Sequence, residues 1–142
     1  MRFILDTNII IPLEQSQQVL EPSLANFVRL ANENGHQLLY HPATIDDINR
    51  DTNLERKKQT LQRLKQYTEL ESRPVCIWNT PEASPNEIAD NEILYAIFSD
   101  AAHALLTEDH GIHRKAKLHG LSERVYYIQT AEDWLTESPL IY

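Results

Sequence analysis

Short apolar runs alternate along this chain with longer segments in which apolar residues recur every three or four positions. The short runs have the length of β-strands, and the longer segments have the period of α-helices. Their apolar character is nearly continuous, which is typical of strands buried on both faces of a parallel sheet, and they are too short to cross a membrane. The clearest of them cover residues 1–5, 36–41, 102–107 and 125–128.

Helices are predicted between these strands. The first long one starts at Leu20 to Ser23, with Pro22 in its first turn, and ends at Asn34-Gly35. A second has Pro42 in its first turn, directly after the second strand. A long basic helix is predicted over residues 53–71, with Leu54, Leu61 and Leu64 on one side and Arg56 and Arg63 on the opposite side.

The second half of the chain continues this alternation. Residues 72–84 are predicted to be a connecting loop, with a short strand at 75–78 as an alternative. Ser84-Pro85-Asn86-Glu87 is a capping box that starts a helix ending near Ser99, and further helices are predicted over 111–119 and from Thr130 onward. Alternating strands and helices indicate a three-layer α/β/α sandwich with a central, mainly parallel sheet of four to five strands.

Composition narrows the class of protein. The chain has 142 residues, of which 42% are hydrophobic, so residues 1–142 are expected to form a single domain with a genuine core. No secretory signal or apolar run of membrane-spanning length is found in the sequence, so we expect a soluble cytoplasmic protein with no membrane partner. The single Cys76 excludes an internal disulfide, and its apolar surroundings indicate a buried structural thiol.

The charge is unevenly distributed. The net charge of −8 argues against a protein that holds nucleic acid by bulk electrostatics. Most of the basic residues nevertheless cluster in two segments, residues 50–73 and 114–117. The first cluster is either a solvated helix face or a surface that steers phosphate toward a site. Arg56, Arg63 and Arg114 are the candidates for substrate binding.

Four aspartates occupy positions from which they can converge. Asp6 and Asp109 each follow a buried strand, and open parallel sheets bind ligands beyond the carboxyl ends of their strands. Asp47 and Asp90 lie early in helices that begin near the same edge. Each has an alternative explanation: Asp6 could cap a helix over residues 9–14, and Thr44-x-x-Asp47 could be a capping box. Periodicity does not decide whether Asp46 or Asp47 faces the strand ends.

Four carboxylates in one cleft would repel one another unless cations neutralised them. Ligation by oxygen alone favours Mg²⁺ or Mn²⁺ over zinc. The chemistry that uses such a site is the hydrolysis of phosphate esters. His110 and His113 flank the four acids and could bind Mn²⁺ or relay protons, although a solvated helix start is the favoured explanation for them.

At these positions the chain resembles the PIN-domain nucleases. The resemblance covers nearly the whole chain and rests on its opening and closing motifs in combination. The segments that carry it are Phe3-Ile4-Leu5-Asp6-Thr7-Asn8, residues 41–48, Ile88-Ala89-Asp90 and Ala104-Leu105-Leu106-Thr107-Glu108-Asp109.

The resemblance implies that Asp6, Asp47, Asp90 and Asp109 surround the metal, with Asn8 and Thr107 as polar neighbours. PIN domains typically have Glu where this chain has Asp47, so the shorter side chain would place Asp47 behind the direct ligands. The activity implied is metal-dependent cleavage of single-stranded or structured RNA, often by the toxin of a toxin–antitoxin pair and often by a homodimer.

One alternative is a protein that has the PIN fold but no nuclease activity. A PIN-fold interaction module would bind protein or RNA without cutting it, and the acidic surface is compatible with that. The abrupt apolar ending, Ser138-Pro139-Leu140-Ile141-Tyr142, is typical of the N-terminal piece of a longer polypeptide. An antitoxin or an appended C-terminal domain would then supply part of the substrate surface.

Overall fold

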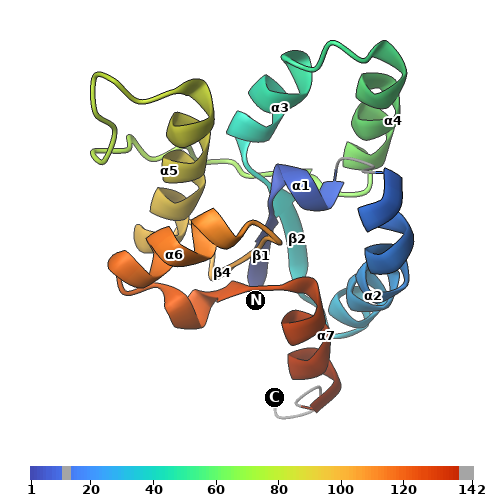
Figure 1. The fold of residues 1–142 in the computed structure, drawn as a ribbon. Helices are drawn as coiled ribbons and strands as arrows, with labels where there is room; N and C mark the ends of the chain where they lie inside the picture. Colours follow the sequence, from blue (N-terminus) through green and yellow to red (C-terminus); the bar gives the residue numbers. More distant parts are fainter. Residues whose placement is uncertain (11–13, 138–142) are drawn as a thin grey trace.

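A computed structural model describes residues 1–10 and 14–137 (Figure 1). Five parallel strands form one sheet in the order β3-β2-β1-β4-β5, so the first strand of the chain lies at its centre. The strands are β1 (Arg2–Leu5), β2 (Gln37–Tyr40), β3 (Thr68–Glu69), β4 (Ala104–Leu106) and β5 (Val125–Tyr126). The predicted α/β class and parallel sheet are confirmed.

Helices connect successive strands and cover both faces of the sheet. In Figure 1, α2 and α7 lie on one side of the strands and α5 and α6 on the other, so the three predicted layers are present. The helices are α1 (Thr7–Ile10), α2 (Glu14–Glu33), α3 (Pro42–Asn49), α4 (Leu54–Leu64), α5 (Pro85–Phe98), α6 (His110–Leu118) and α7 (Ile128–Glu137), with a 3₁₀ turn, η1, at Ser122–Arg124.

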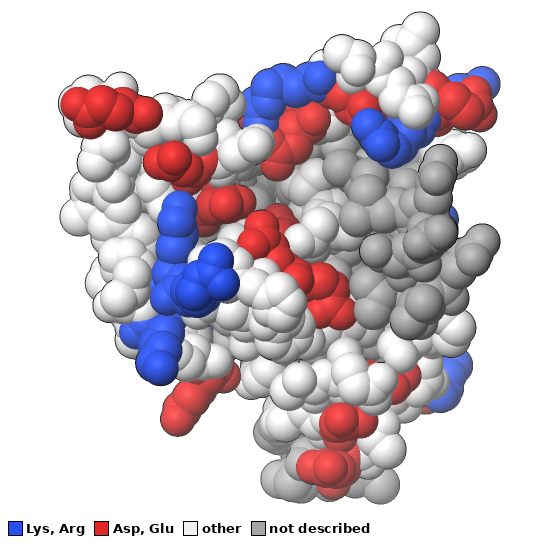
Figure 2. Space-filling model, in the orientation of Figure 1, with Lys and Arg blue, Asp and Glu red and all other residues white. Residues whose placement is uncertain are grey.

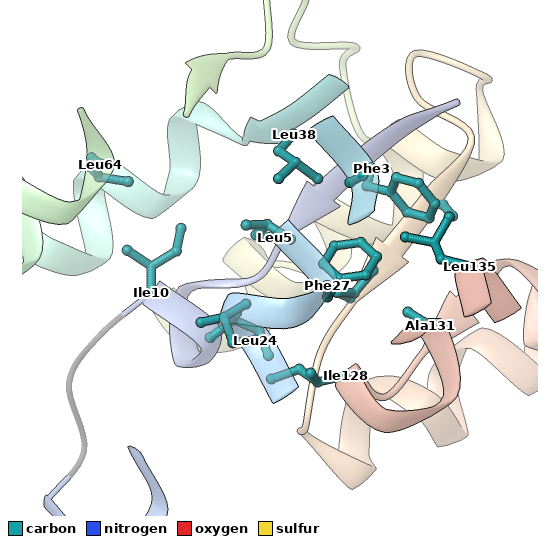
Figure 3. Packing of buried hydrophobic residues seen from close by; sticks show 14 of the residues in the cluster. Phe3, Leu5, Ile10, Leu24, Phe27, Leu38, Leu64, Ile128, Ala131 and Leu135 are labelled. Carbon is teal, nitrogen blue, oxygen red and sulfur yellow. The ribbon is translucent and has the colours of Figure 1, made fainter. Parts of the chain in front are cut away.

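The two faces of the sheet bury separate cores because successive side chains of a strand point to opposite sides. Phe3 and Leu5 of β1 pack with residues of α2 and α7 (Figure 3). The ring of Phe3 meets that of Phe27 edge to face, with 5.3 Å between ring centroids. Ile4, between them in sequence, faces the core under α5 and α6. β1 is therefore buried on both faces, as its sequence predicts.

The basic helix is shorter than predicted. Asn53 caps α4, which ends at Leu64 rather than near residue 71, and the chain then forms β3 beside β2. Both residues of β3 are exposed, so this strand has no apolar pattern for sequence analysis to detect. The apolar side of α4 is also partly exposed, since Leu54 is 77% and Leu61 is 38% accessible.

Three further local predictions need correction. The helix expected to start at Leu20 to Ser23 begins at Glu14 and continues through Pro22, although a proline inside a helix removes one hydrogen bond and crowds the preceding turn. The last helix begins at Ile128, before Thr130. The predicted buried position of Cys76 is wrong, because this side chain is only partly buried. The segment around it, residues 75–78, is a loop without a strand, which confirms the first prediction for it.

Two remaining expectations concern the chain ends and the membrane. The apolar ending at residues 138–142 lies outside the described residues. Within the described part of the chain, no helix is both long enough and apolar enough to span a bilayer.

Candidate functional site: a carboxylate cleft at the strand ends

A cleft of about 560 Å³ opens beyond the carboxyl ends of β1 and β4. All four predicted aspartates, Asp6, Asp47, Asp90 and Asp109, line it together with Asn8. Figure 2 shows acidic side chains gathered in this central hollow. The sheet topology therefore brings together carboxylates that lie up to a hundred residues apart in sequence.

Asp6 forms the floor of the cleft. Its side chain follows β1 and is almost fully buried, with 5% of its surface exposed. The backbone N–H of Thr7 donates to Oδ1 at 2.8 Å, and the Thr107 hydroxyl donates to Oδ2 at 2.7 Å. Burial raises the pKa of Asp6 to about 7; the hydrogen bond from Thr107 opposes this rise, and the charges of Asp90 and Asp109 add to it.

The alternative role of Asp6 as a helix cap is partly correct. The bond from the Thr7 N–H is a local one at the start of α1, and Ile9 N donates to the backbone oxygen of Asp6. The described part of α1 covers Thr7–Ile10, and residues 11–13 of the helix expected over residues 9–14 lie outside the described residues. Capping leaves Oδ2 to interact with Thr107 from the other strand.

Asp90 extends the floor, and Asp109 lies exposed at its outer edge. Asp90 lies half-buried in the second turn of α5, where burial first and the charge of Asp109 next raise its pKa to about 6. Lys115 of α6 opposes that rise. Asp109 is the N-cap of α6, and its Oδ1 accepts a 2.7 Å hydrogen bond from the N–H of Gly111. A Cβ at Gly111 would lie 3.0 Å from that oxygen, so glycine leaves room for the cap.

The structure settles which of the two neighbouring aspartates of α3 faces the cleft. Asp47 does, with its Oδ2 lying 3.1 Å from the hydroxyl of Thr7 and its Oδ1 paired with the guanidinium of Arg50. Burial raises the pKa of Asp47 in spite of these partners. Asp46 is exposed on another side of the helix, 3.4 Å from Arg73.

The capping-box explanation for Thr44 and Asp47 is wrong. His41 is the N-cap of α3, and its Nδ1 accepts from the backbone N–H of Ala43. Thr44 is fully buried, and its hydroxyl lies 3.1 Å from that of Thr7. Thr44 therefore supports the residue beside Asp6 instead of starting the helix.

Asn8 and Thr107 act as polar supports. The buried hydroxyl of Thr107 donates to Asp6 and accepts from the backbone N–H of Asp109 at 3.1 Å. Asn8 donates to the same hydroxyl at 3.3 Å. One threonine side chain thus fixes the spacing between the ends of β1 and β4, and with it the two acids that follow these strands.

The three predicted substrate-binding arginines lie in different places. Arg56 lines the carboxylate cleft, where its guanidinium makes two hydrogen bonds, of 2.6 and 2.7 Å, with the carboxylate of Asp51. Arg63 lines a separate apolar groove between α1, α2 and α4. Arg114 is exposed on α6 and is not among the residues that line the cleft.

His110 and His113 have structural partners. His110 Nδ1 lies 2.8 Å from the hydroxyl of Tyr127. His113 stacks on the ring of Tyr127 at 3.7 Å, and its Nε2 lies 2.8 Å from the backbone oxygen of Thr107. Neither imidazole lines the cleft, which favours the structural explanation for both.

Sequence reasoning did not single out several residues at the site. Arg50, Asp51, Thr52 and Asn86 also line the cleft. Arg50 had a detectable signal, because it lies three residues after Asp47 in one helical turn and can pair with it. The Nζ of Lys115 lies 3.2 Å from Oδ1 of Asn91, at the Asp90 side of the cleft, and only its membership of a basic cluster marked it.

The donor set can be compared with the needs of the divalent cation that the sequence resemblance implies. The floor offers carboxylate oxygens, which hard cations prefer, and the raised pKa values of Asp6 and Asp90 mark a place where positive charge is favourable. No group of three or more acidic, His or Cys side chains within the described residues is arranged to hold a metal by itself. The carboxylate oxygens of Asp6 and Asp90 in the cleft fit a hydrated Mg²⁺ or Mn²⁺ ion, because such an ion commonly keeps several waters beside one or two carboxylates.

Comparisons with known proteins give no further indication of function. No protein-family model matches the chain, and no curated protein matches it in sequence. Function must therefore be inferred from the residues of the cleft.

Proposed function

We propose that this protein is a metal-dependent endoribonuclease of the PIN-domain type that hydrolyses phosphodiester bonds in RNA. The observation that supports this best is the convergence of Asp6, Asp90 and Asp109 in one cleft at the strand ends. Burial first, and then the charges of Asp90 and Asp109, raise the pKa of Asp6, so the charged carboxylate is unfavourable until a cation compensates it.

Asp6 and Asp90 would hold the cation, with Asp109 at the outer edge. When bound, a divalent ion would supply an activated water and stabilise the charge that develops on the phosphate. Thr107 keeps Asp6 in place through its hydroxyl. Asp47 is turned toward Arg50 and Thr7, which supports a position for it behind the direct ligands.

Basic side chains at the border of the cleft would hold the substrate. Arg50 and Arg56 lie on one side of it, and Lys115 lies near Asp90 on the other. Guanidinium groups suit phosphate oxygens because they offer paired donors in a plane. Figure 2 shows basic side chains on both sides of the acidic hollow, an arrangement that fits a chain of phosphates better than a single one.

A cleavage assay tests the proposal. Labelled single-stranded and hairpin RNAs are incubated with the protein and Mn²⁺ or Mg²⁺, and EDTA is added to a parallel sample. We expect cleavage that EDTA abolishes and that falls by about 10²- to 10³-fold in Asp6→Asn and Asp109→Asn, the size typical of losing one group that stabilises transition-state charge. Asp46→Asn is the matched control, since Asp46 is exposed and faces Arg73.

One observation favours a second candidate function. The absence of a three-residue metal group in the described part of the chain is what a non-cleaving interaction module would show. Such a module would leave every RNA intact while binding RNA or protein, and Asp109→Asn would not alter that binding. Intact RNA in Mn²⁺ alongside a folded circular dichroism spectrum would establish this alternative.

A further inference from the structure

An aromatic cluster lies at the far end of α5 and α6, with one ring, that of Phe98, exposed and the others partly buried. The ring of Trp78, from the loop before α5, stacks on His119 at 3.8 Å and meets Tyr95 and Phe98 at 5.0 and 5.2 Å. We call these four residues the aromatic platform. Three of the exposed large apolar side chains belong to it or adjoin it: Phe98 is 48%, Ile77 is 75% and Leu118 is 83% accessible.

Exposing Phe98, Ile77 and Leu118 to water is unfavourable, and their grouping differs from the single exposed apolar residues found on most protein surfaces. Apolar side chains scattered singly over a surface are normal, whereas contiguous patches mark binding sites. Trp78 rests on the core beneath α5 and α6, so Phe98 is presented on a rigid base. The packing of Trp78 against the core thus holds the exposed ring of Phe98 in place.

A polar line connects the platform to the cleft. The charge of Lys115 lowers the pKa of Asp90, and its Nζ donates to Oδ1 of Asn91 at 3.2 Å. Asn91 in turn donates to Asn79, the chain neighbour of Trp78, at 3.0 Å. Helical spacing continues the line on both helices. Asn91, Tyr95 and Phe98 follow one side of α5, and Lys115 and His119 follow one side of α6.

The helix that leads from the cleft to the platform is basic. Arg114, Lys115 and Lys117 lie on α6, and Figure 2 shows basic side chains gathered over this helix beside the hollow. The acidic residue at the platform's end, Asp100, is paired with Arg124 at 3.0 Å. Exposed rings beside cationic side chains are the combination that binds single-stranded nucleic acid, because bases stack on the rings and the cations meet phosphates.

We propose that the aromatic platform binds the unpaired bases of an RNA strand that continues from the carboxylate cleft along α6. Residues 90 to 98 of α5 span about 12 Å, at about 1.5 Å per residue. A stacked strand rises about 3.4 Å per nucleotide, so the path takes up three to four nucleotides beyond the cleft. The inference deepens the proposed function, on which it rests for the identity of RNA, by specifying single-stranded substrate and the direction in which it leaves the site.

Equilibrium binding without cleavage tests this. The probe is a fluorescein-labelled 12-nucleotide oligouridine in EDTA, measured by anisotropy across a salt series. We expect about fivefold or greater weakening for Phe98→Ala and for Leu118→Ser, by the usual value of a lost stacking or apolar contact. Lys115→Gln should lower the salt slope by about one. Leu54→Ala, which removes an equally exposed leucine from α4, should leave affinity unchanged.

A spectroscopic signal identifies the contact directly. In a Trp134→Phe background, Trp78 is the remaining tryptophan, and we expect oligouridine to quench its emission. A dinucleotide should quench it weakly, because it is too short to occupy both the cleft and the platform. A duplex of the same length should compete poorly, since its bases are already stacked.

The possible results separate this inference from the proposed function. Normal RNA affinity in both Phe98→Ala and Leu118→Ser, with no quenching of Trp78, overturns the inference even where Mn²⁺ supports cleavage. Platform-dependent binding without any cleavage in Mn²⁺ upholds the inference and rejects the nuclease. If sedimentation shows a dimer that the same substitutions dissociate while RNA affinity is unchanged, the platform contacts a second copy and the inference fails.

Discussion

Two groups of aspartates in the same cleft have opposite electrostatics. On the floor, burial raises the pKa of Asp6 to about 7, and the hydrogen bonds that Asp6 receives come from neutral donors, Thr7 and Thr107. At the rim, Asp51 forms a bidentate pair with Arg56, which lowers its pKa to about 2. The same side chain is therefore protonated more easily in one place and less easily in the other.

The difference shows what each group is suited to do. A carboxylate that an arginine already neutralises has little need of another cation, and it orients that arginine toward the cleft. A buried carboxylate without such a partner is costly as an anion, and a bound cation relieves that cost. Acidic residues alone thus do not define a metal site; the pattern of their partners does.

The largest effect expected is a pH dependence in metal-free protein. The raised pKa of Asp6 means that the folded state binds its proton more tightly than the unfolded state does. The resulting stability is complete below pH 4 and is lost as the pH rises through 7, by about 4 kcal/mol for a shift of this size. The lowered pKa of Asp51 has the opposite effect on stability and acts in a more acidic range. Its contribution to stability is present above pH 4 and is lost toward pH 2.

Urea unfolding in EDTA at several pH values measures this dependence. Wild type should be more stable at pH 5 than at pH 8. Asp51→Asn is the matched control, because it should reduce the dependence of stability on pH only below pH 4. Equal stability of wild type at pH 5 and pH 8 would show that the floor carboxylates are not held in an unfavourable state.

The next effect is the stabilisation caused by removing the charge at the floor. Asp6→Asn in EDTA at pH 8 should raise stability by about 3 kcal/mol, because it removes the buried charge but disturbs a hydrogen bond worth about 1 kcal/mol. Asp51→Asn should lower stability, since Arg56 loses its partner. Thermal melts compare the two. Destabilisation by both substitutions would abolish the distinction between floor and rim.

Metal binding should follow at a similar size. A cation at a hundredfold excess over its Kd should stabilise wild type by about 2.7 kcal/mol. Asp6→Asn should respond much less, and Asp51→Asn should respond like wild type. Differential scanning fluorimetry in millimolar Mn²⁺, Mg²⁺ or Ca²⁺ makes the measurement. An identical response from Asp6→Asn would place the ion elsewhere on the protein.

The smallest effect concerns the arginines of α4. Arg56 lines the cleft and Arg63 lines the groove beside α2, although both belong to one basic helix. Arg56→Gln should therefore lower the salt slope of RNA binding by about one, and Arg63→Gln should leave it unchanged. Anisotropy titrations at several salt concentrations decide it. Equal changes in both variants would restore the idea of one continuous basic face.

Much of this site could be predicted from the sequence because each of three acids in the cleft lies beside a recognisable local sequence signal. Asp6 and Asp109 come directly after buried apolar runs, and Asp90 lies in the second turn after the Ser84 capping box, whose hydroxyl does accept from Glu87 N. Parallel strands end at one edge, so these markers converge as soon as the sheet is parallel.

What could not be predicted depends on contacts between distant segments. Asp46 and Asp47 are both flanked by isoleucines, and only the Thr7 hydroxyl on one side and Arg73 on the other distinguish them. β3 is invisible for a different reason. Its two residues are exposed and follow a helix, and they become a strand because the backbone of β2 offers them an open edge.

The central place of β1 also has a consequence for synthesis of the chain. β1 leaves the ribosome before the other strands of the sheet, yet Ala104, which pairs with Phe3, follows about a hundred residues later. At about 5–20 residues per second, that delay lasts roughly 5–20 s. During this time β1 can pair with β2, but the backbone N–H and C=O groups on its other edge stay unpaired. The nascent chain is therefore a candidate for chaperone binding. Asp6 and Asp109 come together only when β4 pairs with β1, so the acidic cleft is completed after β4 has been synthesised.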